Sequence, residues 1–427
     1  MNILLILFGK ILSSFINLLG LGKGSTWPGH IALGANENFS REILKNSKVK
    51  IIFVAGTNGK TTTSKLISKI LEGAEKKVLH NEAGANLENG LASALIKGSD
   101  LFGKINYDYL IFESDESTLP LILKKINPHY LILLNLFRDQ LDRYGEIDSI
   151  AKKWGSAVVK LNKNTKIIAN ADDALITYIT LKSKLKTYFF GIDNSKEKIH
   201  SIPHGADSIY CPRCNSKLDF EFINFSHLGI WECSNCYLKR PKLDIAEFEF
   251  YPLSGTYNMY NTLAAVLFSK LNNITDESIL SSLKSFSPAF GRQEKIEIDG
   301  KKVQLFLSKN PTSFNESLNT ISSLGAKNIL IVLNDRIPDG RDISWIWDIN
   351  LSKLKKFKKI ILSGERVYDL ALRIKYENLK NIQTHEDLGG AINFGLKNTK
   401  KNETLFILPT YSAMLEIRKI LTGRKIL

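Results

Sequence analysis

The sequence predicts an α/β protein built from two doubly wound domains, with a small four-cysteine module inserted into the first. Three observations lead to this fold class. A buried apolar strand runs directly into a glycine-rich turn and a helix at residues 48–71. All four cysteines of the chain lie between residues 211 and 236. Apolar runs at 327–333, 358–362 and 404–408 alternate with helical stretches, which is typical of a doubly wound, Rossmann-like sheet.

Length and composition limit the classes of protein that this sequence can encode. With 427 residues the chain is expected to form two or three domains, and its 44% of hydrophobic residues excludes a disordered protein. The formal net charge of +15 favours anionic partners such as nucleotides, nucleic acid or an acidic membrane surface. Because an excess of solvated lysines would give the same charge, this number alone does not choose among those partners.

The N-terminal stretch Met1–Gly22 is apolar and carries a single charged residue, Lys10. A signal peptide would need a charged start and a small-residue cleavage site, and neither is clear. A transmembrane helix would be barely long enough. The interruptions at Ser13, Ser14 and Asn17 fit a helix that packs on the domain or lies in the plane of a membrane surface. We expect a helix of this third kind.

The first chemical motif is a phosphate-binding loop. A strand over Lys48–Ala55 precedes the loop and a helix over Ser64–Leu71 follows it. The loop itself reads Gly56, Thr57, Asn58, Gly59, Lys60, Thr61, Thr62, Thr63. Its backbone N–H groups and the start of the helix would hold phosphate oxygens, while Lys60 reaches the β- and γ-phosphates and Thr61 ligates Mg²⁺. The motif therefore predicts ATP and magnesium.

Acidic residues follow the next expected strand. Glu113 and Glu116 come at the end of an apolar run that starts at Tyr109. A strand end beside a phosphate loop is where a second magnesium ligand and a catalytic carboxylate belong. Another strand, Tyr130–Asn135, leads to Arg138 and to further acidic residues. We expect Glu113 and Glu116 to bind magnesium, and Glu116 together with Lys60 to act in catalysis.

The cysteines have the spacing of a four-thiolate zinc ribbon, in which two tight turns each offer two sulfurs to one tetrahedral ion. They are Cys211, Cys214, Cys233 and Cys236. We place the module at 205–242, inside the first domain. The alternative is a pair of structural disulfides. It is the weaker alternative, because an ATP-using protein is expected in the cytosol, where thiols stay reduced. Because a zinc site would occupy every cysteine, chemistry that needs a free thiol would have to come from another polypeptide.

Together these segments resemble the Mur ligase family. The resemblance runs from about residue 49 to the end of the chain. It rests on the loop 56–63, the acidic segment 113–117 and the segment 138–146, in which Gln140 replaces the usual histidine. It also rests on the helix that carries Asn258 and Asn261 and on the hinge segment 290–294 with Arg292. It implies that Asn258, Asn261 and Arg292 belong to the ATP site.

The resemblance also implies a division into three parts. These are an N-terminal helical segment at 1–45, a central ATP-binding domain at 46–288 and a C-terminal domain at 289–427, with the nucleotide in the cleft between the two domains. About fifty residues precede the loop, which is too few for the UDP-sugar domain of ordinary family members. Where the family has a carbamylated lysine this chain has Trp154, with Lys152 and Lys153 nearby, so the presence of that lysine stays open.

Two C-terminal segments, 307–316 and 334–348, are similar to one branch of the family, the MurT-type synthetase subunits. This similarity implies amidation of the α-carboxylate of D-glutamate in the lipid II peptide stem, through an acyl phosphate, during cell wall synthesis. The ammonia would come from a class I glutaminase of the GatD type. The resemblance further implies an aspartate that completes the partner's Cys–His pair. Asp348 is our first choice, with Asp342 and Asp339 as rivals.

Such an enzyme would work in the cytoplasm, at the inner face of the cell membrane where lipid II lies. Two alternatives are open. A stand-alone ligase of the Mur or folylpolyglutamate type would take an amino acid instead of ammonia. A nucleic-acid-binding ATPase would use the zinc ribbon, but the ribbon is not rich in lysine or arginine, so we expect no nucleic acid partner.

Overall fold

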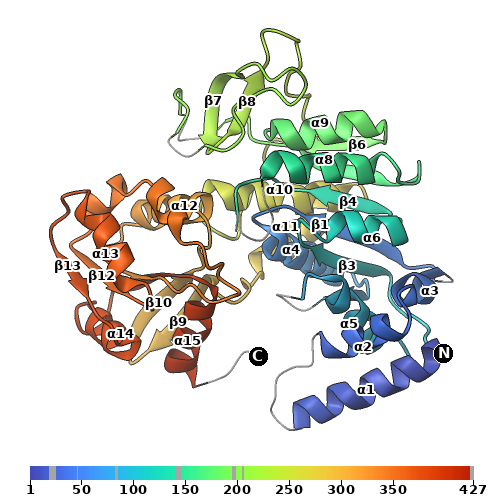
Figure 1. Ribbon diagram of the computed structural model, residues 1–427, viewed down its shortest axis with the longest axis horizontal. Helices are drawn as coiled ribbons and strands as arrows, with labels where there is room; N and C mark the ends of the chain where they lie inside the picture. The colour runs from blue at the N-terminus through green and yellow to red at the C-terminus, as the bar shows by residue number, and fades with distance from the viewer. Residues whose placement is uncertain are drawn as a thin grey trace.

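In the computed structural model of the protein, two α/β lobes lie side by side and a small β-hairpin module projects from one of them (Figure 1). The structure describes residues 1–18, 26–45, 47–81, 85–139, 146–194, 199–203 and 206–423. Each lobe has one six-stranded sheet at its centre, and the chain crosses between the lobes once, after residue 284.

Three helices precede the first strand: α1 (Asn2–Leu18), α2 (Trp27–Ala35) and α3 (Phe39–Lys45). They share a small apolar core in which Ile6, Phe39 and Ile96 are buried. The expected N-terminal helix is therefore present and packs on the first lobe. Within the described residues, no helix is long and apolar enough to cross a membrane.

The first sheet is parallel throughout, with strand order β2-β3-β1-β4-β5-β6. Its strands are β1 (Lys50–Ala55), β2 (Val78–His80), β3 (Tyr109–Ser114), β4 (Tyr130–Leu133), β5 (Lys166–Asn170) and β6 (Thr187–Phe190). The central strands are apolar on both faces because helices cover both sides of the sheet. The order reverses beside β1, so the loop after β1 lies at a switch point, where parallel sheets bind ligands.

Helices cover the two faces of this sheet. One face packs against α5 (Glu88–Gly98), α6 (Leu119–Lys125), α8 (Ile147–Val158) and α9 (Ala174–Ser183). The other face packs against α4 (Lys60–Gly73), α10 (Thr256–Lys270) and α11 (Asp276–Lys284). Trp154 is buried in the first of these cores and Phe268 in the second.

A two-stranded antiparallel hairpin, β7 (Asp219–Phe225) and β8 (Leu228–Glu232), carries the cysteine module. Figure 1 shows it beyond α9, away from the other lobe's sheet. The indole N–H of Trp231 donates to the carbonyl of Ala171, and the Arg240 Nε donates to Asp172 at 2.6 Å. These contacts attach the module to the loop that follows β5.

The second sheet has the order β13-β12-β11-β14-β10-β9, in which only the β9–β10 pair is antiparallel. Its strands are β9 (Arg292–Ile298), β10 (Lys301–Phe306), β11 (Asn328–Val332), β12 (Lys359–Ser363), β13 (Ile382–Thr384) and β14 (Thr404–Pro409). One face packs against α12 (Pro311–Ser323), α13 (Val367–Lys375) and the short 3₁₀ helices η1 (Ser344–Asp348) and η2 (Ser352–Lys356), and the other against α14 (Leu388–Lys397) and α15 (Tyr411–Thr422).

Candidate active site

The phosphate-binding loop joins β1 to α4, as the motif predicts. Gly59 has a φ of +90°, and a Cβ atom built there would lie 2.1 Å from the Asn261 Oδ1. Any other residue would therefore be strained in the backbone and would displace the Asn261 side chain of α10. Helix α4 begins at Lys60, so its first N–H groups face the turn, where they can receive phosphate oxygens.

Lys60 is buried and folds back across the loop. Its Nζ lies 2.5 Å from the Gly56 carbonyl oxygen, 3.2 Å from that of Thr57 and 3.3 Å from the Glu116 Oε2. The ammonium thus sits between the backbone of the loop and an acidic side chain. That is the position from which it can neutralise charge on a phosphate group held by the loop.

Carboxylates gather at the carboxyl end of β3. The Thr61 hydroxyl donates to the Glu113 Oε2 at 2.6 Å, and the His80 Nε2 lies 3.3 Å from the Glu113 Oε1. Burial alone raises the pKa of the Glu113 carboxyl, but His80, Thr61 and the charge of Arg292 outweigh it and hold this pKa below its ordinary value. Glu113 is therefore ionised at neutral pH.

Two buried carboxylate oxygens in this region have no hydrogen-bond partner among the described residues: the Oε1 of Glu116 and the Oδ1 of Asp139. Unpaired buried carboxylate oxygens are costly unless a cation binds them. The Thr61 hydroxyl and the Glu113 carboxylate, which contact each other, are likewise oxygen donors, the kind that Mg²⁺ prefers. Of the residues predicted to bind magnesium, Thr61 and Glu113 contact each other and line the cavity between the lobes, and their oxygen atoms suit the ion, whereas Glu116 contacts Lys60.

The position of Trp154 bears on the question, left open by the sequence, of whether the chain keeps the family's carbamylated lysine. The Trp154 side chain is fully buried on α8, and its indole N–H donates to the backbone carbonyl of Glu116 at 2.8 Å. Lys152 and Lys153 lie on the exposed side of the same helix. Neither lysine therefore occupies the inward position of Trp154, which fixes the acidic loop by a backbone hydrogen bond. Gln140, the other departure in this region, lies outside the described residues.

A cavity of about 440 Å³ lies between the two lobes above the loop. Predicted residues that line it are Thr57, Asn58, Gly59, Lys60, Thr61, Thr62, Glu113, Asn258, Asn261 and Arg292. The Asn258 Nδ2 donates to the Ser254 carbonyl, and the Asn261 Oδ1 accepts from the Thr63 hydroxyl, so α10 is fixed against the loop. Burial lowers the pKa of Arg292, while the charge of Glu113, which lines the same cavity, opposes that shift.

The C-terminal lobe adds two residues to this site whose roles the sequence did not reveal. Lys309 lines the cavity and its ammonium pairs with the Asp139 carboxylate of the first lobe. Burial lowers the pKa of Lys309, but Asp139, Glu116 and Asp115 outweigh it and raise this pKa. Asn310 caps α12 and donates from Nδ2 to the Asn58 Oδ1 at 3.3 Å. The capping pattern of Asn310 and Pro311 is visible in the sequence, but Asp139 and Asn58, the partners of Lys309 and Asn310, lie in the other lobe.

The four cysteine sulfurs lie within 4.8 Å of one another, and all four are free thiols. The Sγ atoms of Cys211 and Cys236 are 3.5 Å apart, as are those of Cys214 and Cys233. Each turn ends in a residue with positive φ, Asn215 at +62° and Tyr237 at +57°, which turns the chain back so that both sulfurs of a turn face inward. The cluster can hold one tetrahedral metal ion and matches a zinc site in its donor set.

Comparison with known proteins places this arrangement in a family. The Mur ligase middle domain family matches residues 54–269, and the MurT ligase C-terminal family matches residues 307–414. The lipid II isoglutaminyl synthase (glutamine-hydrolyzing) subunit MurT of Staphylococcus aureus strain COL is 32% identical over 374 residues, which cover 83% of this chain and 83% of that protein. The lipid II isoglutaminyl synthase subunit MurT of Streptococcus pneumoniae is 30% identical, and the match covers 97% of this chain and 96% of that protein. The chain belongs to the Mur ligase family, in its MurT branch.

Solved structures confirm the predicted Mur ligase fold. A pseudomurein peptide ligase type C from Methanothermus fervidus has a TM-score of 0.68 at 22% identity, covering 90% of this chain and 80% of that one. The MurF ligase from Thermotoga maritima in complex with ADP has a TM-score of 0.63 at 16% identity, covering 90% and 82%. At these identities the likeness concerns the fold.

The three aspartates considered for the MurT-type partner function differ in their surroundings. Asp339 is buried, and its carboxylate accepts from the backbone N–H of Ser412 at 2.7 Å and of Arg336 at 3.2 Å. Asp342 is exposed and accepts from the N–H of Ser344 in its own turn. Asp348 ends η1 with its side chain 36% exposed, and its Oδ2 lies 3.3 Å from the Arg138 Nη1. Of the three, Asp348 combines an exposed carboxylate with a cation that orients it.

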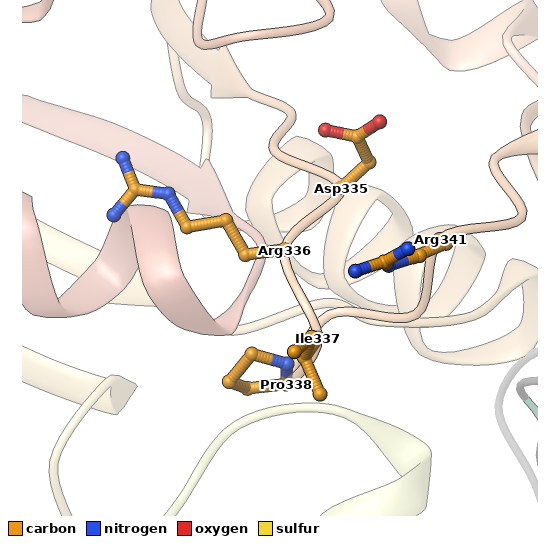
Figure 2. A pocket seen from close by; sticks show the side chains of 5 residues that line it. All are labelled: Asp335, Arg336, Ile337, Pro338 and Arg341. Atoms are coloured by element: carbon orange, nitrogen blue, oxygen red, sulfur yellow. The ribbon is translucent and has the colours of Figure 1, made fainter.

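The loop with Asp339 also borders a second hollow, of about 580 Å³ (Figure 2). Pro338 lines both this hollow and the nucleotide cavity. Figure 2 shows Arg336 extending away from the Arg341 guanidinium, and Arg336 pairs with Glu416 of α15 at 2.6 Å. The hollow is therefore adjacent to the cavity and has the exposed cation of Arg341 at its edge.

Proposed function

We propose that this protein is the ATP-dependent synthetase subunit of a lipid II isoglutaminyl synthase, which converts the α-carboxylate of D-glutamate in the lipid II peptide stem to the amide of D-isoglutamine. The observation that carries the proposal is the cavity between the lobes, where Lys60 and Glu113 face Lys309 and Arg292 in a chain of the MurT branch. The relatives at 30–32% identity are named as this subunit.

The reaction has two steps. A carboxylate oxygen of the substrate attacks the γ-phosphorus of ATP, ADP leaves, and an acyl phosphate forms. Ammonia then attacks the carbonyl carbon, the phosphate leaves with the bonding electrons, and the ammonium proton is lost to give the amide. Phosphorylation is needed because the carboxylate oxygen is otherwise a poor leaving group.

The residues of the chain would act on charge and position. The loop 56–62 binds the phosphates, and Lys60 neutralises charge on the transferred phosphoryl group. Asn258, Asn261 and Arg292 fix the nucleotide against α10 and β9. Thr61, Glu113 and Glu116 would hold Mg²⁺, which supplies further charge stabilisation when bound. The hollow beside Arg341 is our candidate for the acidic peptide stem, because it borders the cavity at Pro338 and has an exposed cation at its edge.

The ammonia is proposed to come from a separate glutaminase subunit of the GatD type, in a heterodimer. The name of the relatives, a glutamine-hydrolyzing synthase subunit, supports a partner of this kind. If the four thiols hold zinc, the chain itself has no cysteine left to hydrolyse glutamine. Asp348 is the residue we propose to orient the partner's histidine.

The surface around Asp348 supports docking there. Trp347 is 47% exposed and packs against Tyr376, which is 68% exposed, with 5.5 Å between the ring centres. Arg373 donates to the carbonyl oxygens of Ile346 and Ile349 and so fixes η1 on α13. A rigid turn with exposed aromatic side chains beside a carboxylate is the composition of a protein interface.

We further propose that the cysteine cluster holds one structural zinc ion, and that the chain divides at 1–45, 46–288 and 289–427, so that each six-stranded sheet lies within one domain. The closed four-thiolate geometry leaves no open position for substrate, which is why the role assigned to the metal is structural. We place the protein in the cytoplasm at the inner face of the membrane, where ATP and lipid II meet.

The deciding experiment incubates the purified protein with lipid II, ATP, magnesium and ammonium, and measures amidation by mass spectrometry of the released stem peptide. We expect amide formation with stoichiometric ADP. The Lys60→Ala variant should lose at least about 10²-fold in rate, while the control Lys69→Ala, on the same helix, should be unaffected. Product from an added amino acid instead of ammonium, or ATP turnover that depends on DNA or RNA, would overturn the proposal.

A further inference from the structure

Helix α1 presents a continuous apolar stripe to the outside. Its members are Leu4, Phe8, Ile11, Phe15 and Leu18, which are between 51 and 82% exposed. Their spacing alternates between four and three residues, so they lie along one side of the helix for its whole length of about 25 Å. Solvated helix faces are normally polar, and a long apolar one indicates a contact with another apolar phase.

The opposite side of α1 is already occupied by the protein. Ile6 is fully buried, and a Cβ atom at Gly9 would lie 2.9 Å from the Ile96 side chain of α5. Glycine at this position lets the helix lie flat on α5 and α2. Figure 1 shows α1 at the edge of the molecule, with α2 and α5 on its inner side and no labelled element beyond it. The stripe is therefore held outward by a fixed helix.

A neighbouring turn adds two more apolar side chains. Leu101 is 56% exposed and Phe102 is 82% exposed, at the tip of the turn after α5. The Asp100 carboxylate accepts from the backbone N–H groups of Phe102 and Lys104, which fixes the tip. The turn reaches α1 at Gly103, where a Cβ would lie 3.1 Å from Ile6.

The charges around this surface are mainly positive. The Lys10 ammonium donates to the Lys97 carbonyl, so these two lysines are neighbours, and Lys104 follows the exposed tip. The acidic groups on this side are Asp100, which bonds the backbone of its own turn, and Glu42, which accepts from the Asn2 side chain at the start of α1. Lysines that flank an apolar stripe match the surface of an anionic bilayer, which attracts them electrostatically while the stripe enters the headgroup region.

We propose that the stripe of α1, together with Leu101 and Phe102, is a membrane anchor that lies in the plane of an anionic lipid surface. Because one side of α1 is packed on the protein, the helix lies on the bilayer and does not cross it. A second copy of the chain is the less suitable occupant. Helix pairing is normally specified by charged residues along both edges of the apolar seam, and α1 has Lys10 as its single charged residue. The surface would bind lipid whatever reaction the protein catalyses.

The test is co-sedimentation of the full-length protein with vesicles of equal parts phosphatidylglycerol and phosphatidylcholine, compared with vesicles of phosphatidylcholine alone. We expect binding to the mixed vesicles that weakens with salt. The triple variant Leu4→Gln, Ile11→Gln, Phe15→Gln should bind at least about tenfold more weakly, since burial of each of these side chains contributes. Replacing Lys97 and Lys104 by glutamine should weaken binding to the mixed vesicles by about fivefold per lysine.

The control replaces three apolar residues elsewhere that are 45–52% exposed, Val159, Leu181 and Leu324, by glutamine and should bind like the unchanged protein. Light scattering without vesicles gives the oligomeric state of each variant. Failure of the unchanged protein to sediment with mixed vesicles at low salt would overturn the anchor. So would a dimer that the triple variant converts to a monomer, because the stripe would then be an interface between copies.

Discussion

The guanidinium of Arg138 and the carboxylate of Asp348 form an ion pair between the two lobes, with 3.3 Å between Nη1 and Oδ2. The other side of the same guanidinium is held by Asp207, since the Arg138 Nε lies 2.5 Å from the Asp207 Oδ1. Asp207 lies four residues before Cys211, at the base of the cysteine module. Arg138 thus connects the cysteine module and the first lobe to the proposed partner-facing aspartate.

The first prediction concerns Asp348. Asp348→Asn should reduce glutamine-dependent amidation in the complex with the glutaminase by about 10²-fold, because an amide cannot stabilise a protonated histidine in the partner. Amidation from free ammonium should be unchanged, because Asp348 is not among the residues that line the nucleotide cavity. Both rates are measured on the same purified complex.

Asp342→Asn is the control for this experiment, since Asp342 is exposed in the same loop and bonds its own turn. It should leave both rates unchanged. Equal loss of the two activities in Asp348→Asn would place that residue in the synthetase site or in the fold. If Asp342→Asn alone affects the glutamine-dependent rate, the aspartate has been misassigned and the two-subunit mechanism still holds.

The second prediction concerns the cation beside Asp348. Arg138→Met should lower the glutamine-dependent rate by about two- to fivefold, because it frees the carboxylate to rotate. The effect is modest because Arg138 and Asp348 are each about a third exposed, where ion pairs contribute little. Arg138→Lys should restore part of the rate.

Arg336→Met provides the matched control, because Arg336 is also an exposed, doubly paired arginine but contacts Glu365 and Glu416 within the second lobe. It should not change the ratio of glutamine-dependent to ammonium-dependent rates. A ratio that Arg138→Met leaves unchanged would show that Arg138 does not position Asp348.

The third prediction concerns Lys309, which the second lobe brings to the acidic edge of the cavity. Lys309→Met should lower kcat by about 10²- to 10³-fold with ammonium or glutamine alike, because it removes a positive charge close to the transferred phosphoryl group. Lys355→Met, on the surface of the same lobe, is the control. If only the KM for ATP rises and kcat is unchanged, Lys309 binds the nucleotide and does not stabilise the transition state.

The sequence could predict those parts of the site that are local in the chain. The strand, turn and helix from Lys50 to Gly73 follow from one contiguous pattern, and β11, β12 and β14 lie within two residues of the apolar runs that predicted them. The residues that escaped assignment act across lobes. Lys309 meets Asp139 only because the two lobes come together at this edge of the cavity, and no periodicity in either segment encodes that distance.

The inward side of α8 illustrates the same limit. The sequence shows Trp154 next to two lysines and cannot tell which side chain faces the acidic loop. Packing decides it, because the indole fills the core and donates to the Glu116 carbonyl, whereas both lysines reach solvent. Similarly, the segment 290–294 appears as a hinge in the sequence, and the structure shows that it also starts the edge strand β9.

The fourth prediction concerns the metal. Protein purified under reducing conditions should contain one zinc ion per chain, with four sulfur ligands at about 2.3 Å by X-ray absorption. Removing it should lower the melting temperature, because Cys211, Leu218 and Trp231 share a core that the metal would hold together. The cysteine module also carries Asp207, so zinc loss should release Arg138 and reduce the glutamine-dependent rate more than the ammonium-dependent one.

Cys236→Ser tests this link without a chelator, which would also remove magnesium. We expect zinc loss, a lower melting temperature and a fall in the ratio of the two rates similar to that of Arg138→Met. Ser234→Ala, within the same turn but with no sulfur, should keep the metal and both rates. Four intact thiols with no bound metal would refute the zinc site. Zinc loss that lowers both rates equally would leave the metal a structural role but would disconnect the cysteine module from Asp348.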